Sequence, residues 1–154
     1  MTSYEILTAY VGKLRDIPEL VAEVEDAENI VAFVRRFPDL TYLRKWAQEQ
    51  TGPKIIWAQL SKRVAPSSSG DNYVHTFGCV LVPPPEETAS EAPWTDRVHH
   101  LMEKGIPASG GGRPMEEVQP LEGVSPPQNL ELEWIEVEEP GMDVARLTVT
   151  FFEF

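Results

Sequence analysis

Two stretches rich in β-forming residues, 54–64 and 73–82, constrain the fold more than any other feature of the sequence. The segment between them, Pro66 to Asn72, reads Pro-Ser-Ser-Ser-Gly-Asp-Asn and is typical of a loop. The two stretches therefore predict an antiparallel hairpin with a long connection. Pro83, Pro84 and Pro85 end this hairpin, because proline cannot donate a hydrogen bond to a sheet ladder.

A second hairpin is predicted near the end of the sequence. Apolar residues recur at every second position on both sides of a Pro140-Gly141 turn: Leu130, Leu132 and Trp134 before it, and Ala145, Leu147, Val149 and Phe151 after it. The stretch from Glu19 to Phe37 has a period that fits either short strands or a helix. Within it we interpret residues 30–36 as a strand.

Three helices are expected. Thr2 and Glu5 form a capping-box pattern at the start of a helix that runs to about Arg15, and Pro18 marks its end. The other two helices are recognised by apolar residues at helical spacing: Tyr42, Leu43, Trp46 and Ala47 before the stop at Gly52-Pro53, and Trp94, Val98, Leu101 and Met102 before Gly105 and Pro107.

These elements predict an α+β fold, in which a mainly antiparallel sheet of two hairpins packs with two to three helices. A chain of 154 residues with 42% hydrophobic content is suited to one domain with one core, so residues 1–154 are expected to form a single domain. Three consecutive glycines begin at Gly110, and prolines follow them. A flexible loop or arm is therefore predicted at about 105–129.

The charge of the chain limits its partners. A formal net charge of −12 repels the phosphate backbone, which argues against ordinary DNA or RNA binding but leaves open a surface past which DNA slides. Cys79 is the only cysteine and cannot form an internal disulfide. The first residues lack the pattern of a signal peptide, and no apolar run approaches the ~18 residues of a membrane span, so we expect a cytoplasmic protein without a membrane partner.

Two candidate sites in the sequence contain histidine. His99 and His100 with Glu103 suggest a metal site, but adjacent helical residues point apart, so only one histidine readily joins Glu103. Cys79 and His75 share one face of a strand and could form a nucleophilic pair. They are about 13 Å apart on a straight strand at the usual rise per residue, so core packing is the favoured interpretation.

Two further patterns are weaker. Gly110-Gly111-Gly112-Arg113 lacks the Lys-Ser/Thr of a phosphate-binding loop. Acidic residues in and after the predicted strand favour a solvated face over a cation site; they are Glu131, Glu133, Glu136, Glu138 and Glu139. We therefore predict no catalytic, cofactor or metal site, and no enzymatic activity.

The element order and the charge resemble one family, the tail-terminator proteins of long-tailed bacteriophages and phage-like injection machines. Four segments carry the resemblance: the helix 3–15, the hairpin formed by 54–60 and 74–82, the helix 94–103 and the last strand 145–151. The resemblance implies a structural virion protein, assembled in the bacterial host cytoplasm. It would form a homohexameric ring that caps the tail tube and joins it to the neck, with the tube and neck proteins as partners and DNA as passing cargo.

Several residues are candidates for roles in such a ring. The basic pairs Arg35-Arg36 and Arg44-Lys45 could contact carboxylates of a neighbouring copy. Phe152 and Phe154 place aromatic side chains at the end of the last strand, where another subunit could cover them. An acidic lumen, to which Glu131, Glu133 and Glu136 are assigned, would keep DNA from adhering.

Other functions remain open at this point. A head-completion or neck adaptor protein would also be acidic and without catalysis. In a small cytoplasmic enzyme or ligand-binding domain, the four tryptophans would line a pocket; they are Trp46, Trp57, Trp94 and Trp134. An acidic inhibitor or adaptor would occupy a basic partner.

Overall fold

The structure is a computed structural model of the chain. It describes residues 2–36, 49, 52–64, 73–84, 93–104, 120–125, 128–135 and 144–153. Within these ranges the side chains of 34–36, 103–104, 128–135 and 144–149 are outside the description.

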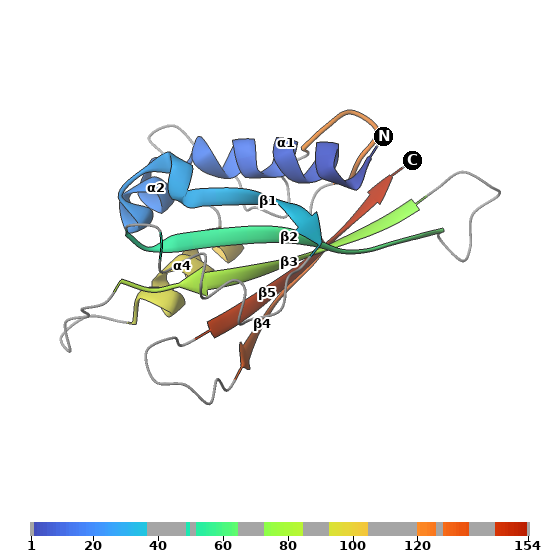
Figure 1. Ribbon diagram of the computed structural model, residues 1–154. Helices are drawn as coiled ribbons and strands as arrows, with labels where there is room; N and C mark the ends of the chain where they lie inside the picture. The colour runs from blue at the N-terminus through green and yellow to red at the C-terminus, as the bar shows by residue number, and fades with distance from the viewer. Residues whose placement is uncertain are drawn as a thin grey trace.

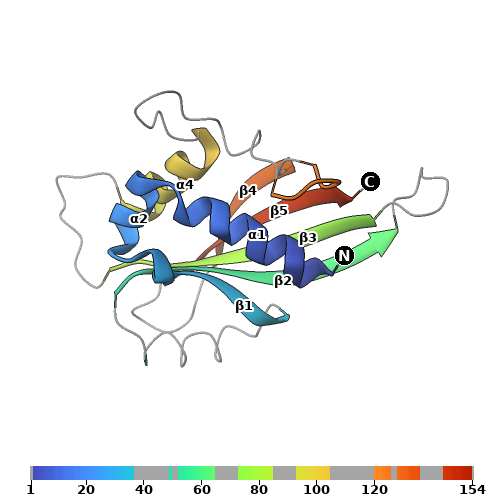
Figure 2. The ribbon, with the colours of Figure 1, turned by 90° about the horizontal axis from the view of Figure 1, so that it is seen from above.

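A five-stranded sheet with the strand order β1-β2-β3-β5-β4 forms one layer of the described part of the chain. Its strands are β1 (Ile30–Arg36), β2 (Lys54–Val64), β3 (Tyr73–Val82), β4 (Gln128–Ile135) and β5 (Val144–Glu153). The helices α1 (Ser3–Arg15), α2 (Pro18–Val24) and α4 (Trp94–Lys104) form the other layer, as Figures 1 and 2 show, and the short 3₁₀ helix η1 (Ala27–Asn29) leads into β1.

The α+β class predicted from the sequence is confirmed. The prediction of a mainly antiparallel sheet made of two hairpins is confirmed only in part. β2 pairs with β3, and β4 pairs with β5, both in antiparallel fashion. However, β1 joins β2 in parallel, with Ile30 opposite Ile55, so the sheet is mixed. A parallel pair needs a crossover connection, and the long segment between β1 and β2 supplies the length for one.

Helix α1 begins where the capping box predicts. The hydroxyl of Thr2 accepts a hydrogen bond from the Glu5 backbone N–H, and the Glu5 carboxylate accepts one from the Thr2 N–H at 2.6 Å. The hydrogen bond from the Thr2 backbone lowers the pKa of Glu5. Two of the N–H groups that a helix start leaves without partners are satisfied in this way.

The ambiguous stretch after Pro18 begins with a helix. Pro18 occupies the first position of α2, where a missing N–H costs nothing, and Leu20 and Val24 are buried. α2 also contacts α4. The indole Nε1 of Trp94 donates to the Glu23 carbonyl at 2.8 Å, and the Arg97 guanidinium binds the Glu23 carboxylate at 3.1 Å.

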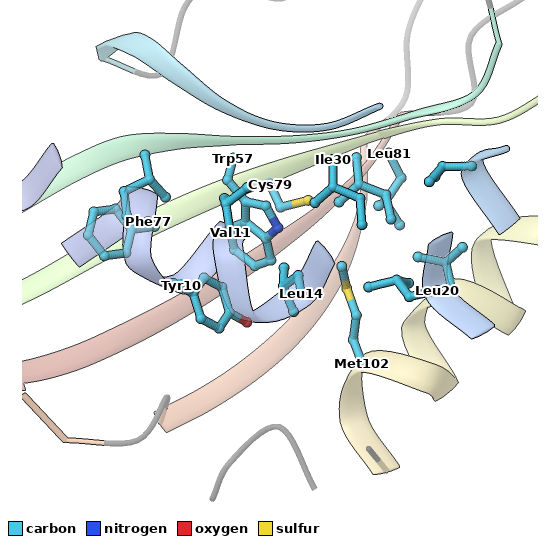
Figure 3. Packing of buried hydrophobic residues seen from close by; sticks show 14 of the residues in the cluster. Tyr10, Val11, Leu14, Leu20, Ile30, Trp57, Phe77, Cys79, Leu81 and Met102 are labelled. Atoms are coloured by element: carbon cyan, nitrogen blue, oxygen red, sulfur yellow. The ribbon is translucent and has the colours of Figure 1, made fainter. Parts of the chain in front are cut away.

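The core lies between the helices and one face of the sheet (Figure 3). Tyr10 of α1 packs edge-on against Trp57 of β2, with ring centroids 5.2 Å apart, and against Phe151 of β5 at 5.0 Å. Phe151 also contacts Phe77 of β3. Trp57 and Trp94 are both buried, as expected of core residues.

Two of the predicted segments fall wholly or largely outside the described residues. They are the helix with Tyr42 and Trp46, and most of the loop or arm at 105–129. Within the latter, residues 120–125 lie against β5. Val124 is buried and forms an isolated antiparallel β-bridge with Glu153. The Ser125 N–H donates to the Phe152 carbonyl, and the Ser125 hydroxyl accepts a hydrogen bond from the Phe152 N–H.

Gly52 and Gly12 provide opposite tests of backbone conformation. Gly52 has a φ of 82°, and a Cβ there would lie 3.2 Å from the Asn29 side chain and 3.2 Å from that of Glu25. Gly12 is helical and exposed, and a Cβ there meets nothing within 4 Å. We expect Gly52→Ala to lower the free energy of unfolding by about 1–3 kcal/mol, and Gly12→Ala to raise it by about 0.5–1 kcal/mol. Urea titration measures both, and equal effects would contradict this account.

Candidate functional site

The first turn of α1 and the end of β5 meet at one end of the molecule (Figures 1 and 2). A chain of polar side chains joins them. The Ser3 hydroxyl lies 2.8 Å from Nδ1 of His75 on β3, and Nε2 of His75 lies 2.7 Å from the Glu153 carboxylate. We call this group the Ser3–His75–Glu153 chain.

The β-sheet register brings His75 and Glu153 together. Phe151 lies opposite His75 and Glu153 lies opposite Tyr73, so His75 and Glu153 are on the same face of the sheet. The His75 side chain is fully buried, whereas that of Glu153 is 15% exposed. The first turn of α1 places the Ser3 hydroxyl against the other side of the imidazole ring.

The hydrogen bond to Glu153 constrains the tautomer of the imidazole. An ionised carboxylate only accepts hydrogen bonds, so Nε2 of His75 carries the proton that Glu153 accepts. The Ser3 hydroxyl can donate to Nδ1 of a neutral ring or accept from Nδ1 of a protonated one. Both ring nitrogens are satisfied, which removes most of the cost of burying a polar ring.

A hydroxyl, an imidazole and a carboxylate linked in this order are also the parts of a hydrolytic triad. A nucleophile must be reached by its substrate and must face donors for the developing oxyanion. Ser3 is only 9% exposed and His75 is fully buried. The burial favours a structural role, in which the chain of hydrogen bonds holds α1 on β3 and β5.

Little in the sequence indicates this arrangement. The strand spacing pairs His75 with Cys79 on the same face, but in the structure the partners of His75 are Ser3 and Glu153, at separations of 72 and 78 residues. No local spacing indicates such partners. Cys79 is buried in the core, and burial raises the pKa of its thiol well above the usual value. That thiol is therefore a poor nucleophile in the folded state.

Past this chain of hydrogen bonds, the paired ends of β2 and β3 extend beyond the first turn of α1 (Figures 1 and 2). We call residues 60–64 of β2 with Tyr73 and Phe152 the hairpin end. Its Leu60, Val64 and Phe152 are 36%, 55% and 40% exposed. Lys62 lies over the Tyr73 ring, with its Nζ 4.5 Å from the ring centroid. The register places Val64 and Phe152 on opposite faces of the sheet, so exposed apolar side chains are present on both faces of this end. Exposed apolar side chains at one end of a molecule are typical of protein contact.

The other residues singled out in the sequence are more widely distributed. Arg35 and Arg36 lie on β1, at one edge of the sheet, whereas Glu131 and Glu133 lie on β4, at the opposite edge. Phe152 is exposed on β5. Four of the predicted residues lie outside the described part of the chain: Arg44, Lys45, Glu136 and Phe154.

The structure describes only some residues of the candidate cation and phosphate sites. His100 is exposed and His99 is half-buried on α4, while the side chain of Glu103 is not described. Gly110 to Arg113 lie outside the described residues. In the described ranges, no group of three or more His, Cys, Asp or Glu is placed to hold a metal ion, and no helix is long and apolar enough to cross a membrane.

The structural role of Ser3 is tested by comparing the same substitution at two positions. Ser3→Ala leaves Nδ1 of a buried imidazole without its hydrogen-bond partner, so we expect a loss of about 1–3 kcal/mol in the free energy of unfolding. Ser61→Ala, at an exposed position of β2, should change it by less than about 0.5 kcal/mol. Urea titration measures stability, and hydrolysis of p-nitrophenyl acetate measures activity. Unchanged stability with loss of ester hydrolysis in Ser3→Ala would instead indicate a catalytic serine.

Cys79 should resist thiol reagents in the folded protein, since burial both shields the sulfur and disfavours the thiolate. We expect labelling by iodoacetamide to be at least about a hundredfold slower at Cys79 than at an exposed thiol introduced as Ser61→Cys. Its rate should rise with urea in parallel with unfolding. Fast labelling in buffer would show that the core around β3 opens readily.

No protein-family model matches this sequence, and no curated protein is significantly similar to it. What the chain does must therefore be inferred from its residues, its fold and its contacts.

Proposed function

We propose that this protein is a structural component of a phage-like particle, a tail terminator that forms a ring on the finished tail tube and joins it to the neck. The observation that carries the proposal is the hairpin end. Its exposed apolar side chains lie beyond the part of the sheet that the helices cover, with Val64 on one face of the sheet and Phe152 on the other. Such a surface is suited to contact with another protein and not to small-molecule chemistry.

The order of the elements supports the same proposal. An opening helix, a β-hairpin, a second helix and a closing hairpin are the pattern on which the resemblance to tail terminators rests, and α1, β2–β3, α4 and β4–β5 follow this order. The described fold adds α2 and the parallel strand β1. Both lie in the stretch between the opening helix and the hairpin, where the pattern of the resemblance has no such elements.

The charge of the chain fits a protein that DNA passes without binding. With a net charge of −12, a ring of several copies would carry a large negative charge. Carboxylates that line a pore repel the phosphate backbone and keep the DNA mobile. In this proposal the protein is made in the bacterial cytoplasm and remains in the virion, with the tube and neck proteins as its partners.

The proposal predicts a defined assembly. Light scattering of the purified protein should give a mass of several chains, with six as the expected number, and negative-stain microscopy should show a ring with a central pore. Where the free protein is monomeric, adding tail tubes should assemble it at their ends. A chain that stays monomeric at every concentration and ignores tail tubes would contradict the terminator function.

A further inference from the structure

We propose that the segment between β1 and β2, residues 37–51, docks on the face of the sheet that points away from the helices. The sheet is then the middle one of three layers. The docking surface on the segment is its apolar stripe at helical spacing, which we call the crossover stripe and which consists of Tyr42, Leu43, Trp46 and Ala47. The proposal concerns contacts within one chain, so it goes beyond the proposed function and does not depend on it.

The face of the sheet away from the helices is buried. The register places Ile56 opposite Val80 and Ala58 opposite Gly78, so these side chains share one face of β2 and β3. Ile56, Ala58 and Val80 are at most 1% exposed, yet none of them belongs to the cluster that packs against the helices. We call these three residues the far face. A sheet face in contact with water leaves such side chains partly exposed, so the far face is covered.

The main helices lie on the other side of the sheet. Residues of α1, α2 and α4 form one cluster with Trp57, Cys79 and Leu81, whose side chains alternate along β2 and β3 with those of the far face. Val124, from the described segment 120–125, belongs to the same cluster. These helices therefore leave the far face to another part of the chain.

The hand of the connection from β1 to β2 selects the side on which it passes. The two strands are parallel, and a connection between neighbouring parallel strands is right-handed in about 98% of cases. In Figure 2, α1 lies towards the viewer, both strands run from left to right, and β1 is below β2. A right-handed connection then passes behind the sheet, which is the side of the far face.

The length and the pattern of residues 37–51 suit this position. β1 ends at Arg36 and β2 begins at Lys54, and a crossover of about a dozen residues or more usually contains a helix. The crossover stripe recurs at i, i+1, i+4 and i+5, so its residues share one side of a helix. Arg44 and Lys45 fall on the opposite side of such a helix.

The composition of the chain favours this segment over the others as the cover. Within residues 37–51 lie the aromatic residues Phe37, Tyr42 and Trp46. The comparable stretches outside the described ranges contain no aromatic residue and are rich in Pro, Gly, Ser and Glu; they are 65–72, 85–92, 105–119 and 136–143. A buried sheet face needs a cover with large apolar side chains, and the crossover stripe provides them.

The docking has a consequence for contacts with other proteins. The far face is occupied from within the chain, so it is not a surface for a neighbouring copy. Arg44 and Lys45, on the outer side of the segment, are instead presented to solvent, where they can meet carboxylates of a partner.

Nuclear magnetic resonance of the wild-type chain tests the contact directly. With labelled Ile, Leu and Val methyl groups and protonated tryptophan, we expect nuclear Overhauser effects from the Trp46 ring or the Leu43 methyl groups to the methyl groups of Ile56 and Val80. A mixture of labelled and unlabelled chains distinguishes contacts within a chain from contacts between copies. The proposal is wrong when Ile56 and Val80 contact only another segment or a second copy.

Neighbouring positions of the segment supply matched variants. Trp46→Ala removes a large side chain from the covered face, so the equilibrium constant for unfolding should rise by at least about a hundredfold. Lys45→Ala, on the other side of the helix, should change it by less than about threefold. Trp46→Phe should have an intermediate effect and replaces Trp46→Ala in the comparison where the latter does not fold.

Urea titration measures the stability of all three variants. Effects of Trp46→Phe and Trp46→Ala no larger than that of Lys45→Ala would show that the stripe does not pack on the sheet. Neither experiment depends on ring formation. A chain whose Trp46 contacts Ile56 but which never forms rings supports the docking and contradicts the terminator function, and rings without that contact do the reverse.

Discussion

The side chain of Tyr10 holds the helical layer and the sheet of the molecule together. Its ring packs edge-on against Trp57 on β2 and Phe151 on β5, two strands separated in the sheet by β3. One side chain of α1 therefore spans three strands. Edge-on aromatic pairs add about 0.5–1.5 kcal/mol each to the free energy of burying the rings. At the N-terminal end of the same helix, the contact between Ser3 and His75 fixes the rotation of α1 about this point.

Much of the fold follows from patterns that are local in sequence. The capping box at Thr2 and Glu5 defines the start of α1, and the alternating runs define both hairpins because turn residues separate them. Residues 18–24 were ambiguous, since the apolar spacing of Leu20 and Val24 fits a helix turn as well as strand alternation. Pro18 at the first position of α2 favours the helix, and so does the hydrogen bond from the Trp94 indole to the Glu23 carbonyl.

The features that the sequence did not predict depend on contacts between distant residues. The parallel pairing of β1 with β2 is not visible in either strand, because strand direction depends on the crossover and not on the residues that pair. The candidate site follows the same rule. His75 is a candidate from the sequence, but its partners Ser3 and Glu153 are 72 and 78 residues away along the chain. Of the predicted interface residues, Phe152 is exposed on β5.

The sheet topology has a consequence for synthesis on the ribosome. β3 lies between β2, its neighbour along the chain, and β5, the last of the described strands in chain order. Until β5 emerges, one edge of β3 has no strand beside it, and the apolar face that includes Phe77 lacks Phe151. An open edge of this kind can pair with another chain. The nascent protein is therefore most prone to aggregation after β3 has emerged and before β5 has, when a chaperone that shields β3 would give the greatest benefit.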